Sequence, residues 1–266
     1  MLRKGYVDTS EGQIHFRAED QGVGPTVFFF HQTASSGSMF EAMMVRLAGR
    51  YRMYALDTPG FGYSFGTDRI PGIGYYADVL TEAVSALHPG PGKVHLCGHH
   101  TGGCIAVDMA VRTMPARTQT LTLMGAVLAT AEERENYRKT FDAPFRPEPS
   151  GAYLKVAHDY LAGLGANTTT ELHHRELVDH LRGWKATPQA FNAVWDQDFE
   201  ALYARVACPI LNICAPDDVV WPFHQRAVAA RPDAEEAVVG GMDFECDRDP
   251  DGCVAALDGF LAKHPV

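Results

Sequence analysis

The sequence predicts an α/β fold built on one doubly wound, mostly parallel central sheet. Two observations support this class: short β-rich runs alternate with helix-like segments, and those runs are continuously apolar instead of alternating between apolar and polar residues. Continuous apolar runs are typical of strands buried on both faces of a parallel sheet. Their alternation with helices favours the doubly wound arrangement.

The predicted strands are short apolar runs, most of which end at a glycine or a polar turn: 27–30, 51–56, 93–97, 120–124, 209–214 and 236–239. Helical spacing of apolar residues predicts helices over 39–48, 76–87, 103–113, 224–230 and 252–263. The opening segment, 5–17, is expected to form an antiparallel hairpin at the edge of the sheet.

One long segment, 128–204, contains no strand candidate and is predicted to form a helical cap. It holds Pro144, Pro147 and Pro149 and several apolar residues at helical spacing. An insertion at this point would cover the carboxyl edge of the sheet, where ligands bind in such folds. We therefore expect two core segments, 1–127 and 205–266, with the cap 128–204 between them.

Composition narrows the classes of partner. The 266 residues include 23 Lys and Arg against 33 Asp and Glu, a formal net charge of −10 without a basic run. This pattern argues against nucleic-acid and anionic-membrane binding. No window approaches the ~20 apolar residues of a membrane-spanning helix, the first residues do not resemble a signal peptide, and the six cysteines lack paired metal spacing. We expect a cytoplasmic protein that binds a small molecule; its oligomeric state stays open.

The segment that carries chemistry surrounds His100. A predicted strand leads into Gly98-His99-His100-Thr101-Gly102, and a predicted helix follows directly. A Gly-x-X-x-Gly sequence between a strand and a helix predicts a sharp, strained turn that needs small residues on either side of its apex. The spacing of the two glycines makes His100 the apex.

The chain resembles the α/β-hydrolase superfamily, in the capped branch that contains esterases, haloalkane dehalogenases, epoxide hydrolases and C–C-bond hydrolases. Four segments carry the resemblance. They are the turn at His100 (which corresponds to the family's nucleophile elbow), His31-Gln32-Thr33, the segment 57–64 (Asp-Thr-Pro-Gly-Phe-Gly-Tyr-Ser) and the segment 215–222 (Ala-Pro-Asp-Asp-Val-Val-Trp-Pro). It implies a backbone oxyanion donor at Thr33 and the family's acid at Asp218.

Two positions depart from the family pattern. The family's nucleophile (Ser, Cys or Asp) is replaced by His100, and its histidine falls on Asp243 in the segment Gly240-Gly241-Met242-Asp243-Phe244. A serine acyl-enzyme route needs a hydroxyl and an imidazole base together, so we do not expect a Ser-His-Asp triad here.

The expected centre is therefore His100, Asp243 and Asp218, with backbone donors from Thr33 and Thr101. We expect Asp243 to orient the His100 ring and the two carboxylates to raise its pKa. Such a centre suits non-covalent acid–base chemistry on a small carbonyl compound: ester or lactone hydrolysis, C–C cleavage, decarboxylation or proton abstraction. No cofactor is expected.

Three further residues are predicted to contact the substrate: Trp221 as an aromatic wall, and His31 and Gln32 beside the oxyanion loop. Two alternatives remain. In the first, the site has lost its catalytic activity and the protein binds a ligand or acts as a scaffold. In the second, one imidazole and two carboxylates bind a divalent cation, with His31 or His99 as a further ligand. We favour an acid–base enzyme over an inactive site, because burying these charged groups is costly unless they are paired. We favour it over a metal site, because the ligand spacing matches no known metal motif.

Overall fold

The computed structural model describes residues 2–140 and 146–266, so part of the predicted cap, with Pro144, lies outside the described residues. Eight strands form one sheet in the order β1-β2-β4-β3-β5-β6-β7-β8. Their bounds are Arg3–Asp8 (β1), Gln13–Glu19 (β2), Thr26–Phe30 (β3), Arg52–Leu56 (β4), Val94–His99 (β5), Thr118–Met124 (β6), Ile210–Cys214 (β7) and Glu235–Val238 (β8).

The sheet is mostly parallel, as the sequence predicted. Strands β4, β3, β5, β6, β7 and β8 pair in parallel, whereas β2 pairs antiparallel with both β1 and β4. The expected antiparallel hairpin is therefore the β1–β2 pair, at one edge of the sheet. Each of the six predicted apolar runs forms a strand. Five of them are buried on both faces, whereas β8, at the sheet edge, alternates between half-buried and exposed residues.

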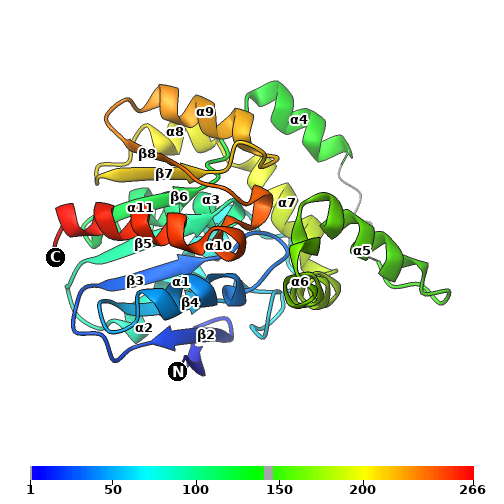
Figure 1. Cartoon of the computed structure of the whole chain (residues 1–266), viewed down its shortest axis with the longest axis horizontal. Coiled ribbons are helices and arrows are strands. Elements are labelled where there is room, and N and C mark those ends of the chain that lie inside the picture. Colours follow the sequence, from blue (N-terminus) through cyan, green and yellow to red (C-terminus); the bar gives the residue numbers. More distant parts are fainter. Residues whose placement is uncertain (1, 141–145) are drawn as a thin grey trace.

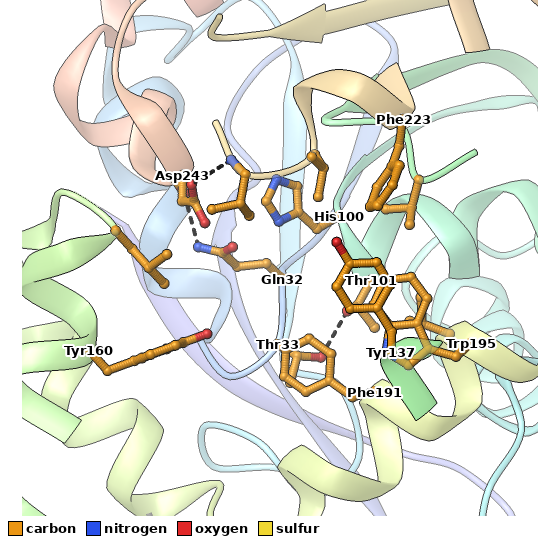
Figure 2. A pocket seen from close by; sticks show the side chains of 15 residues that line it. Gln32, Thr33, His100, Thr101, Tyr137, Tyr160, Phe191, Trp195, Phe223 and Asp243 are labelled. Carbon is orange, nitrogen blue, oxygen red and sulfur yellow. Dashed lines mark hydrogen bonds between the residues drawn. The ribbon is translucent and has the colours of Figure 1, made fainter. Parts of the chain in front are cut away.

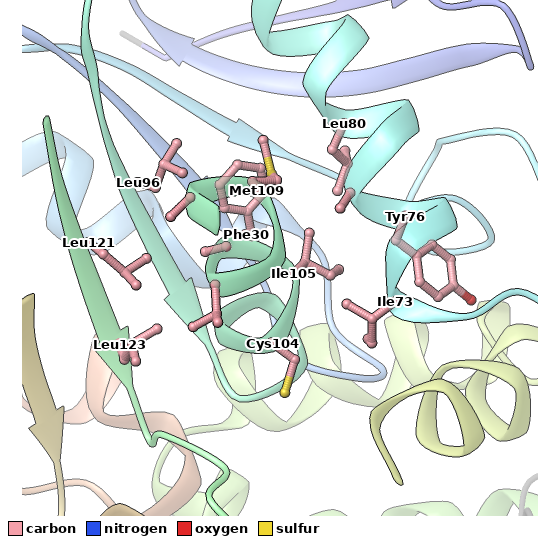
Figure 3. Packing of buried hydrophobic residues seen from close by; sticks show 14 of the residues in the cluster. Phe30, Ile73, Tyr76, Leu80, Leu96, Cys104, Ile105, Met109, Leu121 and Leu123 are labelled. Atoms are coloured by element: carbon pink, nitrogen blue, oxygen red, sulfur yellow. The ribbon is translucent and has the colours of Figure 1, made fainter. Parts of the chain in front are cut away.

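Helices cover both faces of this sheet (Figure 1). On one face lie the short 3₁₀ turn η1 (Gly37–Phe40), α1 (Glu41–Arg46), α10 (Glu245–Arg248) and α11 (Pro250–Lys263). On the other lie α2 (Ile73–Leu87), α3 (Thr101–Asp108), its π-helical continuation η2 (Met109–Thr113) and α9 (Trp221–Ala230). Figure 3 shows the second layer, in which Ile105 of α3 and Leu80 of α2 pack on Phe30 of β3.

The segment predicted as a cap contains helices and, among the described residues, no strand. They are α4 (Ala131–Thr140), α5 (Ala152–Gly163), the 3₁₀ turn η3 (Ala166–Thr168), α6 (Thr170–Arg182), α7 (Ala186–Asp196) and α8 (Phe199–Tyr203). The last two do not form a separate unit: Trp195 of α7 and Tyr203 of α8 belong to the same hydrophobic cluster as the sheet. A small second cluster joins Leu161 of α5 and Leu172 of α6 to Phe244.

Polar contacts fix α6 on the loop that follows β3. Ser36 Oγ donates to Asp179 Oδ2 at 2.7 Å, and Ser35 Oγ donates to Glu176 Oε1 at 3.1 Å. Arg175 donates to both Glu176 and Asp247, at 2.7 and 2.6 Å. Glu176 is fully buried, and these hydrogen bonds to it all reach its Oε1, whereas its Oε2 has no hydrogen-bond partner among the described residues. No helix of the described chain is long and apolar enough to cross a membrane.

Candidate active site

The turn between β5 and α3 holds its apex residue in a backbone conformation that L-residues rarely adopt. His100 has φ 45° and ψ −108°, which costs of the order of 1–3 kcal/mol and persists only where the surroundings enforce it. The flanking glycines are required sterically. A Cβ at Gly98 would lie 2.2 Å from the carbonyl oxygen of Gly102, and one at Gly102 would lie 2.0 Å from that of Phe30.

The imidazole of His100 is fixed by a carboxylate from the loop after β7. Its Nε2 lies 2.8 Å from Asp218 Oδ2, while Asp218 Oδ1 accepts a hydrogen bond from the Val220 N–H at 2.7 Å. Gly125 leaves room for the ring, because a Cβ there would lie 2.3 Å from His100 Cδ2. With Nε2 engaged, Nδ1 is the ring nitrogen left for a ligand.

Charges around this pair favour the imidazolium. Burial opposes the charged ring, but the neighbouring Asp218, with its hydrogen bond, and Asp243 raise the pKa of His100 from 6.5 to about 9. Burial would also raise the pKa of Asp218, yet the charge and hydrogen bond of His100 bring it below its usual value. At neutral pH the pair is therefore an imidazolium facing a carboxylate.

Asp243 is the second carboxylate of the site, and it does not orient the ring as the sequence led us to expect. Asp218 makes the hydrogen bond to His100, whereas Asp243 Oδ1 accepts one from the Val219 N–H at 3.2 Å. Burial, with the negative charge of Asp218 and against the attraction of His100, raises the pKa of Asp243 to about 7. A carboxyl group poised near neutrality is suited to take up and release protons.

Two threonines bring backbone donors together beside His100. Thr101 Oγ1 and Thr33 Oγ1 share a hydrogen bond of 2.9 Å, which ties the start of α3 to the loop after β3. Thr101 occupies the first position of α3, where a backbone N–H has no acceptor within the helix. This hydrogen bond brings together the two loops in which the sequence predicts backbone donors at Thr33 and Thr101.

These residues face a cavity of about 290 Å³ between the sheet edge and the inserted helices. Figure 2 shows its floor, with His100, Asp243, Gln32, Thr33 and Thr101. The inserted helices add Tyr137, Tyr160, Leu164, Phe191, Val194 and Trp195, and the remaining wall comes from Val127, Val219, Val220 and Phe223.

Comparison with known proteins gives the family. Residues 27–256 match the family model described as alpha/beta hydrolase family. The chain belongs to the α/β-hydrolase family.

Among its α/β-hydrolase relatives, the 2-(acetamidomethylene)succinate hydrolase of Mesorhizobium japonicum is 32% identical over 94% of this chain and 92% of that protein. The pimeloyl-[acyl-carrier protein] methyl ester esterase of Nitrosomonas europaea is 26% identical over 77% of this chain and 81% of its own length. The crystal structure of E-2-(acetamidomethylene)succinate hydrolase has a TM-score of 0.80 at 21% identity, covering 98% of this chain and all of that one. The relatives are thus named as esterases and hydrolases, and the fold likeness extends over the whole chain.

The sequence predicted His100 at the family's nucleophile elbow, Asp218 at the position of its acid and Asp243 at that of its histidine. The structure brings all three together. Gln32 also lies where predicted: it lines the cavity, and its Nε2 donates to the carbonyl oxygen of Asp243 at 3.0 Å. The predicted His-Asp-Asp grouping is therefore a spatial cluster in this hydrolase fold.

Two predicted substrate contacts lie elsewhere. Neither His31 nor Trp221 lines the cavity. His31 is buried, with Nδ1 2.6 Å from the carbonyl oxygen of Gln32 and Nε2 accepting from the Thr58 N–H at 2.9 Å, so both nitrogens serve the loop. Trp221 stacks on His224, and Phe223 two residues later forms the wall instead, because the first turn of α9 directs Trp221 away from the cavity.

The residues that offer metal-ligand atoms within 4.8 Å of one another are His99, His100 and Asp218, in the part of the chain that the structure describes. Each imidazole already has a carboxylate partner, since His99 Nε2 lies 3.0 Å from Glu245 Oε2. His31, the other ligand we considered, has no free nitrogen. Both partners of the His99 pair are fully buried. Burial holds the pKa of His99 well below its usual value, and burial with the charge of Asp218 raises that of Glu245 to about 8.

Sequence reasoning missed two contributors to this site, Gly125 and Glu245, and it assigned the aromatic residues of the inserted helices to packing. Gly125 follows β6 directly, and its positive φ of 66° is a property that glycine tolerates. A glycine after an apolar run was read only as the end of a strand. Glu245 falls two residues after Asp243 and carries no motif, so only its contact with His99 shows its place.

Proposed function

We propose that this chain is an enzyme that acts on a small carbonyl compound by acid–base chemistry at His100 and Asp243, without a serine nucleophile. The observation that carries the proposal is His100, held at the elbow by Asp218 at 2.8 Å while it lines the same cavity as Asp243. No serine of the described residues lines that cavity. Hydrolysis of an ester or lactone is the reaction that the named relatives favour.

In such a hydrolysis Asp243 acts as the base and His100 as the acid. The Asp243 carboxylate takes a proton from water, whose oxygen attacks the substrate carbonyl carbon. The resulting oxyanion accepts hydrogen bonds from the N–H groups of Thr33 and Thr101. The imidazolium of His100 then donates its Nδ1 proton to the leaving oxygen as the bond to carbon breaks, and solvent returns the proton from Asp243 to His100.

The same groups also support reactions that pass through an enolate. An enolate formed by C–C cleavage, decarboxylation or proton abstraction carries its charge on the oxygen that the backbone donors and His100 would receive. Orientation by Asp218 keeps the charged ring in place during either reaction. The dicarboxylate named for the Mesorhizobium relative is not the substrate that we propose here, because no described Lys or Arg lines this cavity to pair with its carboxylates.

The test is proton NMR in D₂O of a panel of esters, lactones, β-ketoacids and β-diketones. Hydrolysis, cleavage, decarboxylation and exchange of carbon-bound protons are all visible in one experiment. Turnover that disappears in His100→Ala and in Asp243→Asn, but persists in His174→Ala, supports the proposal; His174 is an exposed histidine of α6.

Turnover that survives in His100→Ala would contradict an acid–base centre at the elbow. Silence of the wild-type protein over the whole panel would favour the alternative, a ligand-binding protein on a hydrolase fold.

A further inference from the structure

One wall of the cavity is made of aromatic rings. Tyr137 of α4 and Trp195 of α7 stack with their ring centroids 4.6 Å apart and their planes 14° from parallel. Phe223 of α9 meets Tyr137 edge-on, at 5.8 Å and 88°. Figure 2 shows these three rings on the side of the cavity away from Asp243. Such a surface favours a flat aromatic ligand, which gains from offset or edge-to-face contact beyond its burial.

Among the described residues, the cavity also has no unpaired positive charge. Its lining contains no Lys or Arg of the described residues, and His100, the one lining imidazole among them, is paired with Asp218 at 2.8 Å. Asp243 lines the cavity as a further carboxyl group. An anionic ligand would therefore lose its hydration without gaining an unpaired cation, and it would lie close to two acidic side chains.

The size of the cavity sets an upper limit. Its volume of about 290 Å³ lies at the small end of the range for ligand pockets. Most of its lining residues carry apolar or aromatic side chains, and its polar groups gather at the floor around His100 (Figure 2). A ligand that fits both parts has a compact apolar body and one polar end.

We propose that the site takes a small, uncharged aromatic carbonyl compound. Its ring packs on the wall of Tyr137, Trp195 and Phe223, and its carbonyl group reaches the donors of Thr33 and Thr101. The chemistry performed on this compound rests on the proposed function above. Binding does not, so the two can be tested separately.

The test is a ligand-observed NMR titration on the His100→Ala protein, for which the proposed function predicts no turnover. Three probes carry a carbonyl group on a six-membered ring and are of similar size: acetophenone, its saturated counterpart 1-cyclohexylethanone, and the anion benzoylformate. We expect acetophenone to bind roughly 3- to 10-fold more tightly than the saturated ketone. Benzoylformate should bind at least about 10-fold more weakly than acetophenone. The same order is expected in wild-type protein.

Two variants locate the effect. Trp195→Leu should abolish the preference for the aromatic ketone. Trp184→Leu should leave it unchanged, because Trp184 lies on the same inserted segment but outside the cavity lining. Benzoylformate binding as tightly as acetophenone, no binding of acetophenone, or an aromatic preference that survives in Trp195→Leu would each overturn the inference. If the aromatic ketone binds as expected but no substrate turns over, the proposed function fails and the ligand class stands.

Discussion

Removing the charge of Asp218 should turn His100 into a neutral imidazole at pH 7. In the native protein the pKa of His100 rises from 6.5 to about 9, against the effect of burial and through the nearby Asp218. That rise corresponds to about 3 kcal/mol in favour of the imidazolium. Burial lowers the pKa of His100, and in Asp218→Asn the main effect that raises it is gone. We therefore expect the pKa of His100 in this variant to lie close to or below its ordinary value.

The same pair makes stability depend on pH in a defined direction. Because the folded-state pKa of His100 lies above its ordinary 6.5, its contribution is fully present below that pH and is lost as the pH rises through about 9. The cost of Asp218→Asn in the free energy of unfolding should therefore shrink by about 3 kcal/mol between pH 6 and pH 10. Urea unfolding of both proteins at the two pH values measures this difference.

The titration itself is followed by NMR of the histidine Cε1–Hε1 groups, with His100→Gln to identify the resonance among the 12 histidines. Asp217→Asn is the matched control, since Asp217 is the exposed neighbouring carboxylate and should leave the midpoint unchanged. A wild-type His100 that titrates at or below its ordinary pKa would refute the reasoning, as would an unchanged midpoint in Asp218→Asn.

Three other outcomes follow from the same site. With Asp243 as base at a pKa of about 7 and His100 as acid at about 9, the rate should rise with pH through the first value and fall through the second. Asp243→Asn should lower the rate at the optimum by about 10²-fold or more; a profile without an acidic limb in wild-type protein would exclude this base. A fluorophosphonate should leave the wild-type protein unlabelled. The double variant His100→Ser, Asp243→His restores the family's residue types and should react with the probe. Mass spectrometry measures the labelling, and a labelled serine in the wild-type protein would contradict the proposal. Gly125→Ala should cost about 1–3 kcal/mol in urea unfolding, because its Cβ would meet the His100 ring at a positive φ. The control is Gly259→Ala, whose Cβ meets nothing within 4 Å; it should leave the free energy of unfolding unchanged or raise it. Equal effects of the two substitutions would contradict the claim that Gly125 makes room for the His100 ring.

Much of the fold is already encoded in short stretches of the chain. The apolar runs predicted six parallel strands, and the structure contains all of them. Gly98 and Gly102 predicted the turn at His100 for a steric reason that the structure makes explicit, because each glycine lies against a backbone carbonyl group. These predictions depend on neighbours in sequence, where periodicity and backbone sterics act directly.

The sequence predicted that the inserted segment is helical, but it did not predict which surfaces its helices pack against. The lack of strand signals over 128–204 predicted helices, and it is the structure that shows residues of α7 and α8 in the same hydrophobic cluster as the sheet. Helical spacing shows that a helix has an apolar face, but it does not show which surface that face meets. The aromatic wall of the cavity was unreadable for the same reason, since Tyr137 and Phe223 meet only across the folded chain.

The sequence by itself determined the fold class and the turn at His100, and it predicted which residue types stand at the positions of the family's nucleophile and histidine. Only the tertiary structure decided that Asp218 and not Asp243 binds the His100 ring, that His31 and Trp221 lie outside the cavity, and that Gly125 makes room for the imidazole. His100 and Asp218 are 118 residues apart in sequence. Contacts over such separations depend on where each strand ends in space and on the direction in which each loop turns its side chains, and no local pattern records either.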